Sequence, residues 1–512
     1  MKTIHTKTNY LFSSLLIVLL VLIYGGSKLL SNHLNPKVIS NASTQIDAWL
    51  EKQNNMKELL DSKKLPEEFF ETEGKAAAIP VLLYHGIIDS NDTSEGITKE
   101  LFIDHMYALK SQGWSTVTLE DFYMFIRGEK TLPYKSFLLT FDDGRKDSFY
   151  FADPVLEKLN YTAAMFVIAG SEGNYYLVED ELKIMHESGR WEIQSHTFKG
   201  HSKINVSDDA EGYFLVNRKW LENEGRLETL KEYISRVEQD IIVSNFTLLN
   251  ITGKVPNYFA FPYGEYGQHS GNTEAAQLIL ENILRKHYKF VFFQAWTEGE
   301  YNYNYPSQSA FYIKRIGVGD NWSTTQLIEN LKKANPKRTN YQDEFAKDNG
   351  WLNPWGLFNI HDGIMSLKSN SNTSGALVYL DGSYHWSNYR LDTEFKLIKG
   401  ETISLLTNFS DGNNYYACNF GEEYASISQN YNGVLKQIVV RQDSLYPLGN
   451  NALASMAVSD YKISCYWFGE LVVWGDIDND DAVNKGGVGV KVWSKELNNA
   501  EAEIDRIIVS SL

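Results

Sequence analysis

Apolar and polar positions follow two different patterns along the chain. From Ile79 onward, short apolar runs alternate with segments whose apolar residues recur at helical spacing. The predicted strands are Ile79–Tyr84, Ser136–Phe141, Ala163–Ile168, Trp191–Ser195, Asn257–Phe261, Lys289–Phe293 and Tyr312–Ile316. The predicted helices are Lys99–Gln112, Leu119–Arg127, Asp147–Leu159, Glu179–Ser188, Leu227–Leu249 and Thr273–His287. This alternation favours a parallel sheet with crossover helices, and the number of strands predicts an α/β fold closed into a (β/α) barrel.

The pattern changes after a polar stretch that begins near Asn335. Short aromatic or β-branched runs, separated by Asn, Asp and Gly, replace the helical spacing. These runs are Gly375–Leu380, Tyr389–Lys396, Thr402–Leu406, Tyr415–Phe420, Val434–Val440, Tyr461–Phe468, Val488–Val492 and Ile504–Val509. They predict an all-β, jelly-roll-like sandwich. We therefore assign residues 76–340 to the barrel and residues 341–512 to the sandwich, a candidate carbohydrate-binding domain.

The N-terminus carries an export signal. Lys2 and Lys7 precede an apolar run from Leu11 to Ile23. A positive segment followed by an apolar one directs a chain out of the cytoplasm. The apolar stretch is shorter than the ~20 residues of a comfortable span, but no clear cleavage site follows it. We favour an uncleaved signal anchor over residues 1–27 and a stalk over residues 28–75, with the catalytic domain outside the cell membrane; cleavage and secretion are the alternative.

Charge and cysteine content exclude several classes of protein. The chain has 48 Lys and Arg against 65 Asp and Glu, a net charge of −17. Such a chain is a poor nucleic-acid binder because it repels phosphates. Its two cysteines, Cys418 and Cys465, are too few for a disulfide scaffold or a Cys-rich metal site. Both fall in predicted strands, where they either pair or remain buried thiols.

Polar residues with useful chemistry directly follow four of the predicted barrel strands. These residues are His85, the pair Asp142 and Asp143, the pair His196 and His201, and the run Pro262, Tyr263, Gly264 and Glu265. The carboxyl ends of barrel strands meet at one mouth, where active sites lie. Two imidazoles and a carboxylate gathered there can hold a metal and leave positions open for water and substrate. Each motif alone is more often a turn or an unrelated loop.

Three of these strings resemble the motifs of a known family. Thr140-Phe-Asp-Asp-Gly144, His196 with His201, and Phe261-Pro-Tyr-Gly264 resemble the first three motifs of the polysaccharide deacetylases, the family 4 carbohydrate esterases. The run from Ile79 to Gly86 is similar to the poly-N-acetylglucosamine deacetylase branch, in which the motif order is permuted. The resemblance covers Ile79 to Trp322.

The resemblance implies a role for each residue. Asp143, His196 and His201 are expected to hold a divalent metal, zinc in the first place. The resemblance makes Asp142 the general base and His85 the general acid, and it gives the backbone N–H of Tyr263 a part in binding the oxyanion. Expected substrate contacts are Pro262, Glu265, Trp296 and Arg315.

One position departs from the family pattern. Many members carry an arginine that orients the base where this chain has Ala260. Arg315, at another strand end, can substitute for it or be an ordinary structural arginine.

The implied activity is metal-dependent hydrolysis of N-acetyl groups from an extracellular or cell-surface amino-sugar polymer similar to poly-N-acetylglucosamine, with release of acetate. Two alternatives remain open: a glycan-binding surface protein without catalysis, and a metal amidase that acts on a non-sugar amide. In the second domain, the runs Gly487–Trp493 and Ala502–Val509 resemble the closing strands of concanavalin-like sandwiches. Its Trp and Tyr residues either bind glycan from exposed positions or form the core.

Overall fold

The computed structural model describes residues 51–61, 63–64, 74–92, 94–268, 270–294, 303–442, 449, 451–459, 461–477 and 486–512. The predicted signal anchor and Trp296 lie outside these residues. The chain divides into two compact units, Met1–Lys64 and Leu65–Leu512. In the first unit, residues 51–61, within the predicted stalk, are helical. No helix among the described residues is both long enough and apolar enough to cross a bilayer.

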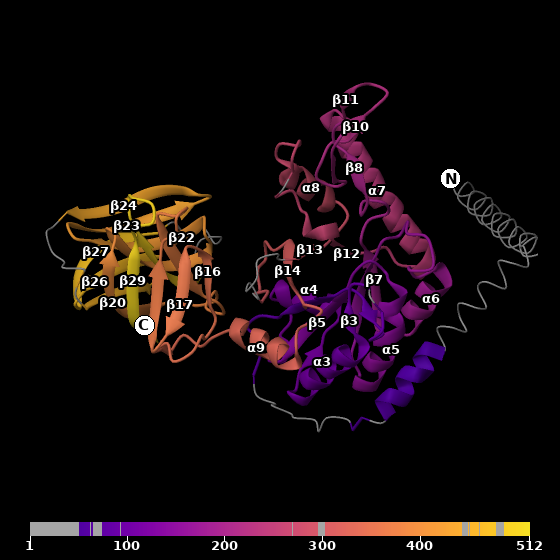
Figure 1. The fold of residues 1–512 in the computed structure, drawn as a ribbon, viewed down its shortest axis with the longest axis horizontal. Coiled ribbons are helices and arrows are strands. Elements are labelled where there is room, and N and C mark those ends of the chain that lie inside the picture. Colours follow the sequence, from indigo (N-terminus) through magenta and orange to yellow (C-terminus); the bar gives the residue numbers. More distant parts are fainter. Residues whose placement is uncertain are drawn as a thin grey trace, which may run out of the picture. The chain divides into compact units, whose positions relative to one another are not determined.

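Seven parallel strands close into a barrel in the second unit (Figure 1). In spatial order they are β1 (Val81–Tyr84), β14 (Tyr312–Gly317), β13 (Phe290–Gln294), β12 (Tyr258–Ala260), β7 (Trp191–Ser195), β6 (Ala163–Val167) and β5 (Ser136–Phe141). The ring closes because β1 pairs with β5 as well as with β14. Each strand overlaps one of the predicted runs, so the predicted (β/α) barrel is confirmed.

Helices surround the barrel, and polar caps fix where several of them begin. They are α3 (Lys99–Ser111), α4 (Leu119–Ile126), α5 (Lys146–Leu159), α6 (Glu179–Glu187), α7 (Leu230–Thr252), α8 (Ala276–Leu284) and α9 (Thr324–Ala334). Thr118 caps α4 through the backbone N–H of Asp121. Thr229 and Glu232 form a capping box at the start of α7, which explains why this helix begins at Leu230 and not at Leu227 as predicted.

Several short strands decorate the barrel. They are β2 (Ile87–Ile88), β3 (Ile97–Thr98), β4 (Ser115–Thr116), β8 (Lys203–Asn205), β9 (Glu211–Tyr213), β10 (Trp220–Leu221) and β11 (Arg226–Leu227). The pairs β8–β9 and β10–β11 form two small hairpins between β7 and α7. The sequence pattern did not predict them, because strands of two or three residues are too short to show a period.

The C-terminal region is a sandwich of two antiparallel sheets, as predicted. The first sheet contains, in order, β17 (Leu357–His361), β18 (Ile364–Lys368), β29 (Glu501–Ser511), β20 (Tyr389–Lys399), β25 (Ala452–Ser459), β26 (Lys462–Trp467) and β27 (Glu470–Asp476), and β15 (Tyr341–Asp343) pairs with β29. The second contains, in order, β16 (Trp351–Trp355), β19 (Gly375–Leu380), β28 (Gly487–Trp493), β21 (Thr402–Asp411), β22 (Asn414–Gly421), β23 (Tyr424–Tyr431) and β24 (Val434–Gln442).

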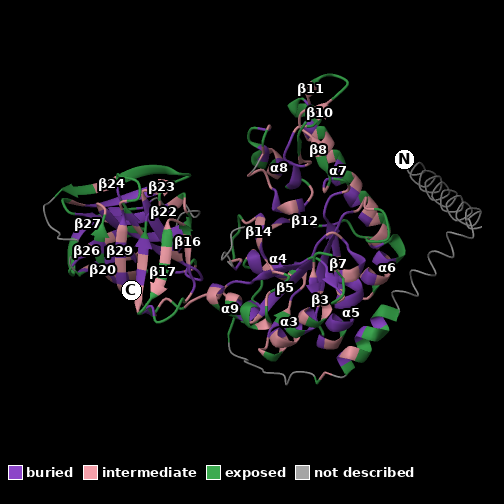
Figure 2. Cartoon of the chain, viewed as in Figure 1, coloured by how far each residue is buried: buried purple, intermediate pink, exposed green. Residues whose placement is uncertain are grey.

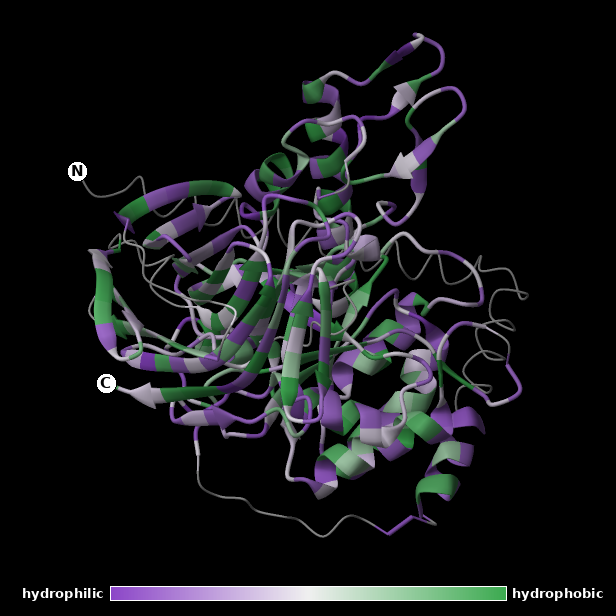
Figure 3. Cartoon of the chain, turned by 60° about the vertical axis from the view of Figure 1, so that its left-hand side comes forward, coloured by the Kyte–Doolittle hydropathy of each residue, from purple (hydrophilic) through white to green (hydrophobic). Residues whose placement is uncertain are grey.

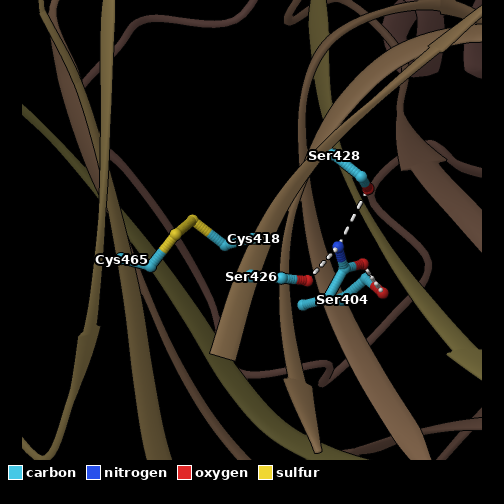
Figure 4. Close-up of a disulfide and its surroundings, with 6 residues drawn as sticks. Ser404, Cys418, Ser426, Ser428 and Cys465 are labelled. Carbon is cyan, nitrogen blue, oxygen red and sulfur yellow. Dashed lines mark hydrogen bonds between the residues drawn. A yellow bond between two sulfur atoms is a disulfide. The ribbon is translucent and has the colours of Figure 1, made fainter. Parts of the chain in front are cut away.

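Many residues on the strands of the two sheets are buried (Figure 2), and their side chains pack into one hydrophobic core. Hydrophobic and hydrophilic residues alternate along the longer strands, as period-two burial requires (Figure 3). A disulfide links Cys418 in β22 to Cys465 in β26, and so joins the two sheets through the core with the Cα atoms 5.8 Å apart (Figure 4). The two cysteines are therefore paired. The sequence left open whether the tryptophans of this domain bind glycan or form the core. Trp351 and Trp467 form part of the core.

Candidate active site

Three side chains from two strand ends converge at the mouth of the barrel. Asp143 follows β5, while His196 and His201 follow β7. One ligand atom from each lies within 4.8 Å of the other two. The Nε2 atoms of His196 and His201 are 3.6 and 3.3 Å from Oδ1 of Asp143. The structure thus brings together the three residues that the sequence assigned to a metal.

The orientation of His196 is fixed from behind. Its buried ring places Nδ1 2.8 Å from the carbonyl oxygen of Ala260 in β12. Because a carbonyl oxygen can only accept a hydrogen bond, Nδ1 carries the proton of this bond. Nε2 therefore has a lone pair, which faces Asp143. Burial lowers the pKa of His196 to about 4, although Asp142 and Asp143 oppose the shift. The ring is therefore neutral near pH 7, which is the form that binds a metal.

The loop between the two histidines is anchored to a helix. Asp240, buried in α7, accepts hydrogen bonds from the backbone N–H groups of Phe198 at 2.6 Å and Lys199 at 2.8 Å. The hydroxyl of Tyr263 donates to the carbonyl of His201 at 2.8 Å, and the two rings lie 4.4 Å apart. These contacts hold His201 in position even though its side chain is partly exposed.

Unusual backbone conformations mark three of the strand ends. Asp143, Thr197 and Tyr263 have φ values of 72°, 75° and 58°. Residues other than glycine rarely adopt this left-handed region, and for a β-branched residue such as Thr197 it is a true outlier. Such strain persists only where the surroundings impose it, and it concentrates at functional sites. Here it lies on or beside the residues that form the mouth.

Asp142 is held by an arginine. Arg315 in β14 donates from both terminal nitrogens to the two carboxylate oxygens, at 2.6 and 2.7 Å. Both side chains are almost completely buried, Arg315 at 1% and Asp142 at 2% exposure. Burial by itself raises the pKa of Asp142, but Arg315, His196 and His85 together lower it below its usual range. Asp142 is therefore an ionised carboxylate at neutral pH, and both terminal nitrogens of Arg315 are engaged in hydrogen bonds to it.

His85 lies at the same mouth and is exposed. It is near enough to both aspartates to lower the pKa of each, although burial opposes the shift in both. The hydroxyl of Ser148 in α5 donates to the carbonyl of His85 at 2.5 Å and ties down the residue that follows β1. An exposed imidazole beside two carboxylates is well placed to exchange protons with a bound molecule.

The remaining predicted contacts lie deeper. Pro262 and Glu265 are buried beside Tyr263, and Trp296 lies outside the described residues. Sequence reasoning missed Tyr213 in β9, whose ring lies 5.0 Å from that of Tyr263. It also missed Asp240 and Ser148. None of the three had a sequence signal, because each depends on a helix or hairpin returning to the mouth.

Comparisons with known proteins agree with this geometry. The polysaccharide deacetylase family model matches residues 129–282. YxkH of Bacillus subtilis (strain 168), whose name assigns it to the polysaccharide deacetylases, is 36% identical over 132 residues, which are 26% of this chain and 46% of that protein. The poly-β-1,6-N-acetyl-D-glucosamine N-deacetylase of Escherichia coli (strain K12) is 27% identical over 176 residues, 31% of this chain and 26% of that protein.

This chain spans less than half the length of each of these two curated relatives. Among solved structures, a de-N-acetylase from Aggregatibacter actinomycetemcomitans matches 49% of this chain and 99% of its own, with a TM-score of 0.42 and 21% identity. This chain is thus similar to the polysaccharide deacetylases over part of its barrel region, by the family model over residues 129–282 and by the curated relatives.

Proposed function

We propose that this chain is a metal-dependent N-deacetylase that removes acetyl groups from a polymer of N-acetylglucosamine and releases acetate. One observation carries the proposal: a carboxylate and two imidazoles converge beside a buried, ionised Asp142 and an exposed His85. The match to the polysaccharide deacetylase family model and the poly-N-acetylglucosamine deacetylases among the relatives support the choice of substrate.

The three convergent residues fit a divalent cation, which we propose to be zinc. One carboxylate oxygen and two imidazole nitrogens are ligand types that zinc prefers, and three protein ligands leave positions open for water and substrate. When bound, the cation polarises the acetamide carbonyl and acidifies the attacking water.

Asp142 acts as the general base in this proposal. Its carboxylate accepts the proton of the attacking water as the water's oxygen bonds to the acetamide carbon. Arg315 supports this step in two ways: it keeps the carboxylate ionised and fixes the direction of its lone pairs. The chain thus supplies from β14 the orienting arginine that Ala260 does not provide.

His85 acts as the general acid, and Tyr263 helps to bind the oxyanion. Breakage of the carbon–nitrogen bond leaves an amine that needs a proton, which an imidazolium at the mouth can donate. The left-handed backbone of Tyr263 turns this segment sharply at the end of β12. In the proposal its N–H donates to the carbonyl oxygen as negative charge develops there.

A comparison of substrates tests this function against its alternatives. Acetate release is measured from oligomers of β-1,6-linked N-acetylglucosamine and from N-acetylated amino acids. Release from the oligomers alone supports the proposal. Release from the amino acids alone favours the non-sugar amidase, and oligomer binding without release under any metal favours a non-catalytic glycan-binding protein.

We further propose that the protein works outside the cytoplasm, attached by its N-terminal segment. The Cys418–Cys465 disulfide supports this location, because disulfides persist in oxidising compartments and are rare in the cytosol. Protease added to intact cells is expected to digest the domains. Their full protection, with digestion only after lysis, would contradict the proposed location.

A further inference from the structure

The two outer faces of the sandwich differ sharply in chemistry. On the outer face of the first sheet, β20 and β29 carry paired charges: Arg390 with Asp392 at 2.8 Å, and Glu394 with Arg506 at 3.1 Å. This is how a sheet face exposed to water normally looks. The outer face of the second sheet is hollowed instead into a groove of about 1000 Å³. Only Glu423 and Lys491, of the thirteen residues that line it, carry a formal charge.

The floor of this groove is a fixed array of hydroxyl groups (Figure 4). The side-chain amide of Asn419 donates to the hydroxyls of Ser426 at 3.2 Å and Ser428 at 2.9 Å, and its oxygen accepts from Ser404 at 2.8 Å. Both N–H donors of this amide are thereby used in holding Ser426 and Ser428, and its oxygen holds Ser404. Ser426 and Ser428 each accept a bond and keep a hydrogen to donate, so the floor offers donors to oxygen atoms.

Apolar and aromatic side chains form the walls. Trp493 at the end of β28 is 36% exposed, and Leu435 and Val440 on β24 are 66% and 43% exposed. Tyr424 is held by its hydroxyl, which lies 2.6 Å from that of Thr402. β24 is an edge strand whose two charged residues do not line the groove. Its residues in the groove wall are apolar or amide side chains, which suit contact with an uncharged ligand.

We infer that this groove binds a stretch of an uncharged, acetylated amino-sugar chain. Hydroxyl donors on the floor suit the hydroxyl and acetamido oxygens of such a chain, and apolar walls suit the faces of its sugar rings. A groove lined by one cation, Lys491, and one anion, Glu423, has no net charge with which to attract a strongly acidic polymer. The choice of an acetylated amino sugar rests on the function proposed for the barrel, and the groove gives the protein a second hold on the same polymer.

Calorimetric titration of the full chain with oligomers of β-1,6-linked N-acetylglucosamine tests the inference. All variants carry Asp142→Asn, so that the ligand is not consumed. Trp493→Ala is expected to weaken binding at the groove about tenfold, and Ser428→Ala about threefold, as loss of one aromatic contact and one hydrogen bond implies. The matched controls, Trp474→Ala and Ser464→Ala, change the same residue types on the outer face of the first sheet and should bind as the parent does.

Equal binding by the Trp493→Ala and Trp474→Ala variants would overturn the inference, whether or not the protein with Asp142 intact releases acetate. Binding that depends on Trp493 without any acetate release would uphold the groove and refute the function proposed for the barrel. Light scattering tests whether a second copy of this chain occupies the groove instead. If the parent is a dimer that Trp493→Ala converts to a monomer, the groove is an interface between copies and the inference is wrong.

Discussion

At the scale of single residues, the proposed catalysis depends on the buried pair of Asp142 and Arg315. Neither side chain reaches solvent, so each is the other's main compensation for lost hydration. Removing one partner of such a pair leaves an uncompensated buried charge. Replacing either residue should therefore lower the stability of the folded protein, and this loss can be measured.

Arg315→Met is expected to lower the free energy of unfolding of the metal-free protein by about 3–5 kcal/mol near pH 7. Because the pKa of Asp142 is lowered in the folded state, the pair stabilises the protein above the unfolded aspartate pKa of about 3.9 and ceases to do so as the pH falls below it. Urea unfolding at several pH values measures this. Arg285→Met, which breaks an exposed pair within α8 and its C-terminal turn, is the control and should cost about 0.5 kcal/mol or less.

The proton-donating role that we propose for His85 leads to a second prediction at this scale. His85→Ala should slow acetate release from N-acetylglucosamine oligomers by about 10²–10⁴-fold. Hydrolysis of an aryl acetate should suffer much less, because a phenolate departs without a proton. Both rates are measured on the same preparations, with His361→Ala, an exposed histidine of β17, as the control. Equal losses on both substrates would remove His85 from the role of general acid.

At the scale of elements, the proposed metal site depends on a helix that contributes none of its three candidate ligands. Asp240 in α7 holds the loop between His196 and His201 through two backbone N–H groups. Asp240→Ala should weaken zinc binding about 10–100-fold, the usual effect of losing a group that orients metal ligands. Competition with a coloured chelator measures the affinity. Gln239→Ala, the exposed neighbour on the same helix, should leave it unchanged; an equal effect of both would point to damage to α7 as a whole.

The candidate site residues at the strand ends could be predicted from sequence, while the residues that hold them in place could not. His85, Asp142 and His196 each follow directly after a predicted strand, so local pattern and barrel geometry place them at one mouth. Asp240 lies in the middle of an amphipathic helix and reads as an ordinary polar position. Arg315 was noticed at its strand end, but only the closed ring of strands shows that β14 carries it to Asp142.

The sandwich shows the same limit. β23 was not among the predicted strands, because Ser426 and Ser428 make its sequence look like a polar loop. The structure shows that they face the groove while Ala425 and Ile427 face the core. A strand whose outward-facing residues are polar can therefore be missed when strands are predicted from the spacing of apolar residues.

At the scale of the whole molecule, the two sheets of the sandwich are covalently linked. The sequence left the state of Cys418 and Cys465 open, because their strands lie in different sheets and only folding brings them together. The bridge spans 47 residues of sequence.

Replacing both cysteines by alanine should lower the free energy of unfolding of the sandwich by about 2–4 kcal/mol, since the unfolded chain gains freedom. Chemical unfolding of the full chain, followed by near-ultraviolet circular dichroism, measures the change. Acetate release from short oligomers should persist in the folded variant. If the variant is as stable as the parent under non-reducing conditions, the expressed protein does not contain the disulfide.

The most direct test of the central claim measures acetate release from N-acetylglucosamine oligomers together with bound zinc. The parent should release acetate, lose this activity when a chelator removes the metal and regain it when zinc is restored. Asp142→Asn should bind zinc as the parent does and release acetate about 10²–10⁴-fold more slowly, because only the base is lost. His196→Ala should lose both metal and activity. Undiminished release by the chelated parent, or by the Asp142→Asn variant, would contradict the account.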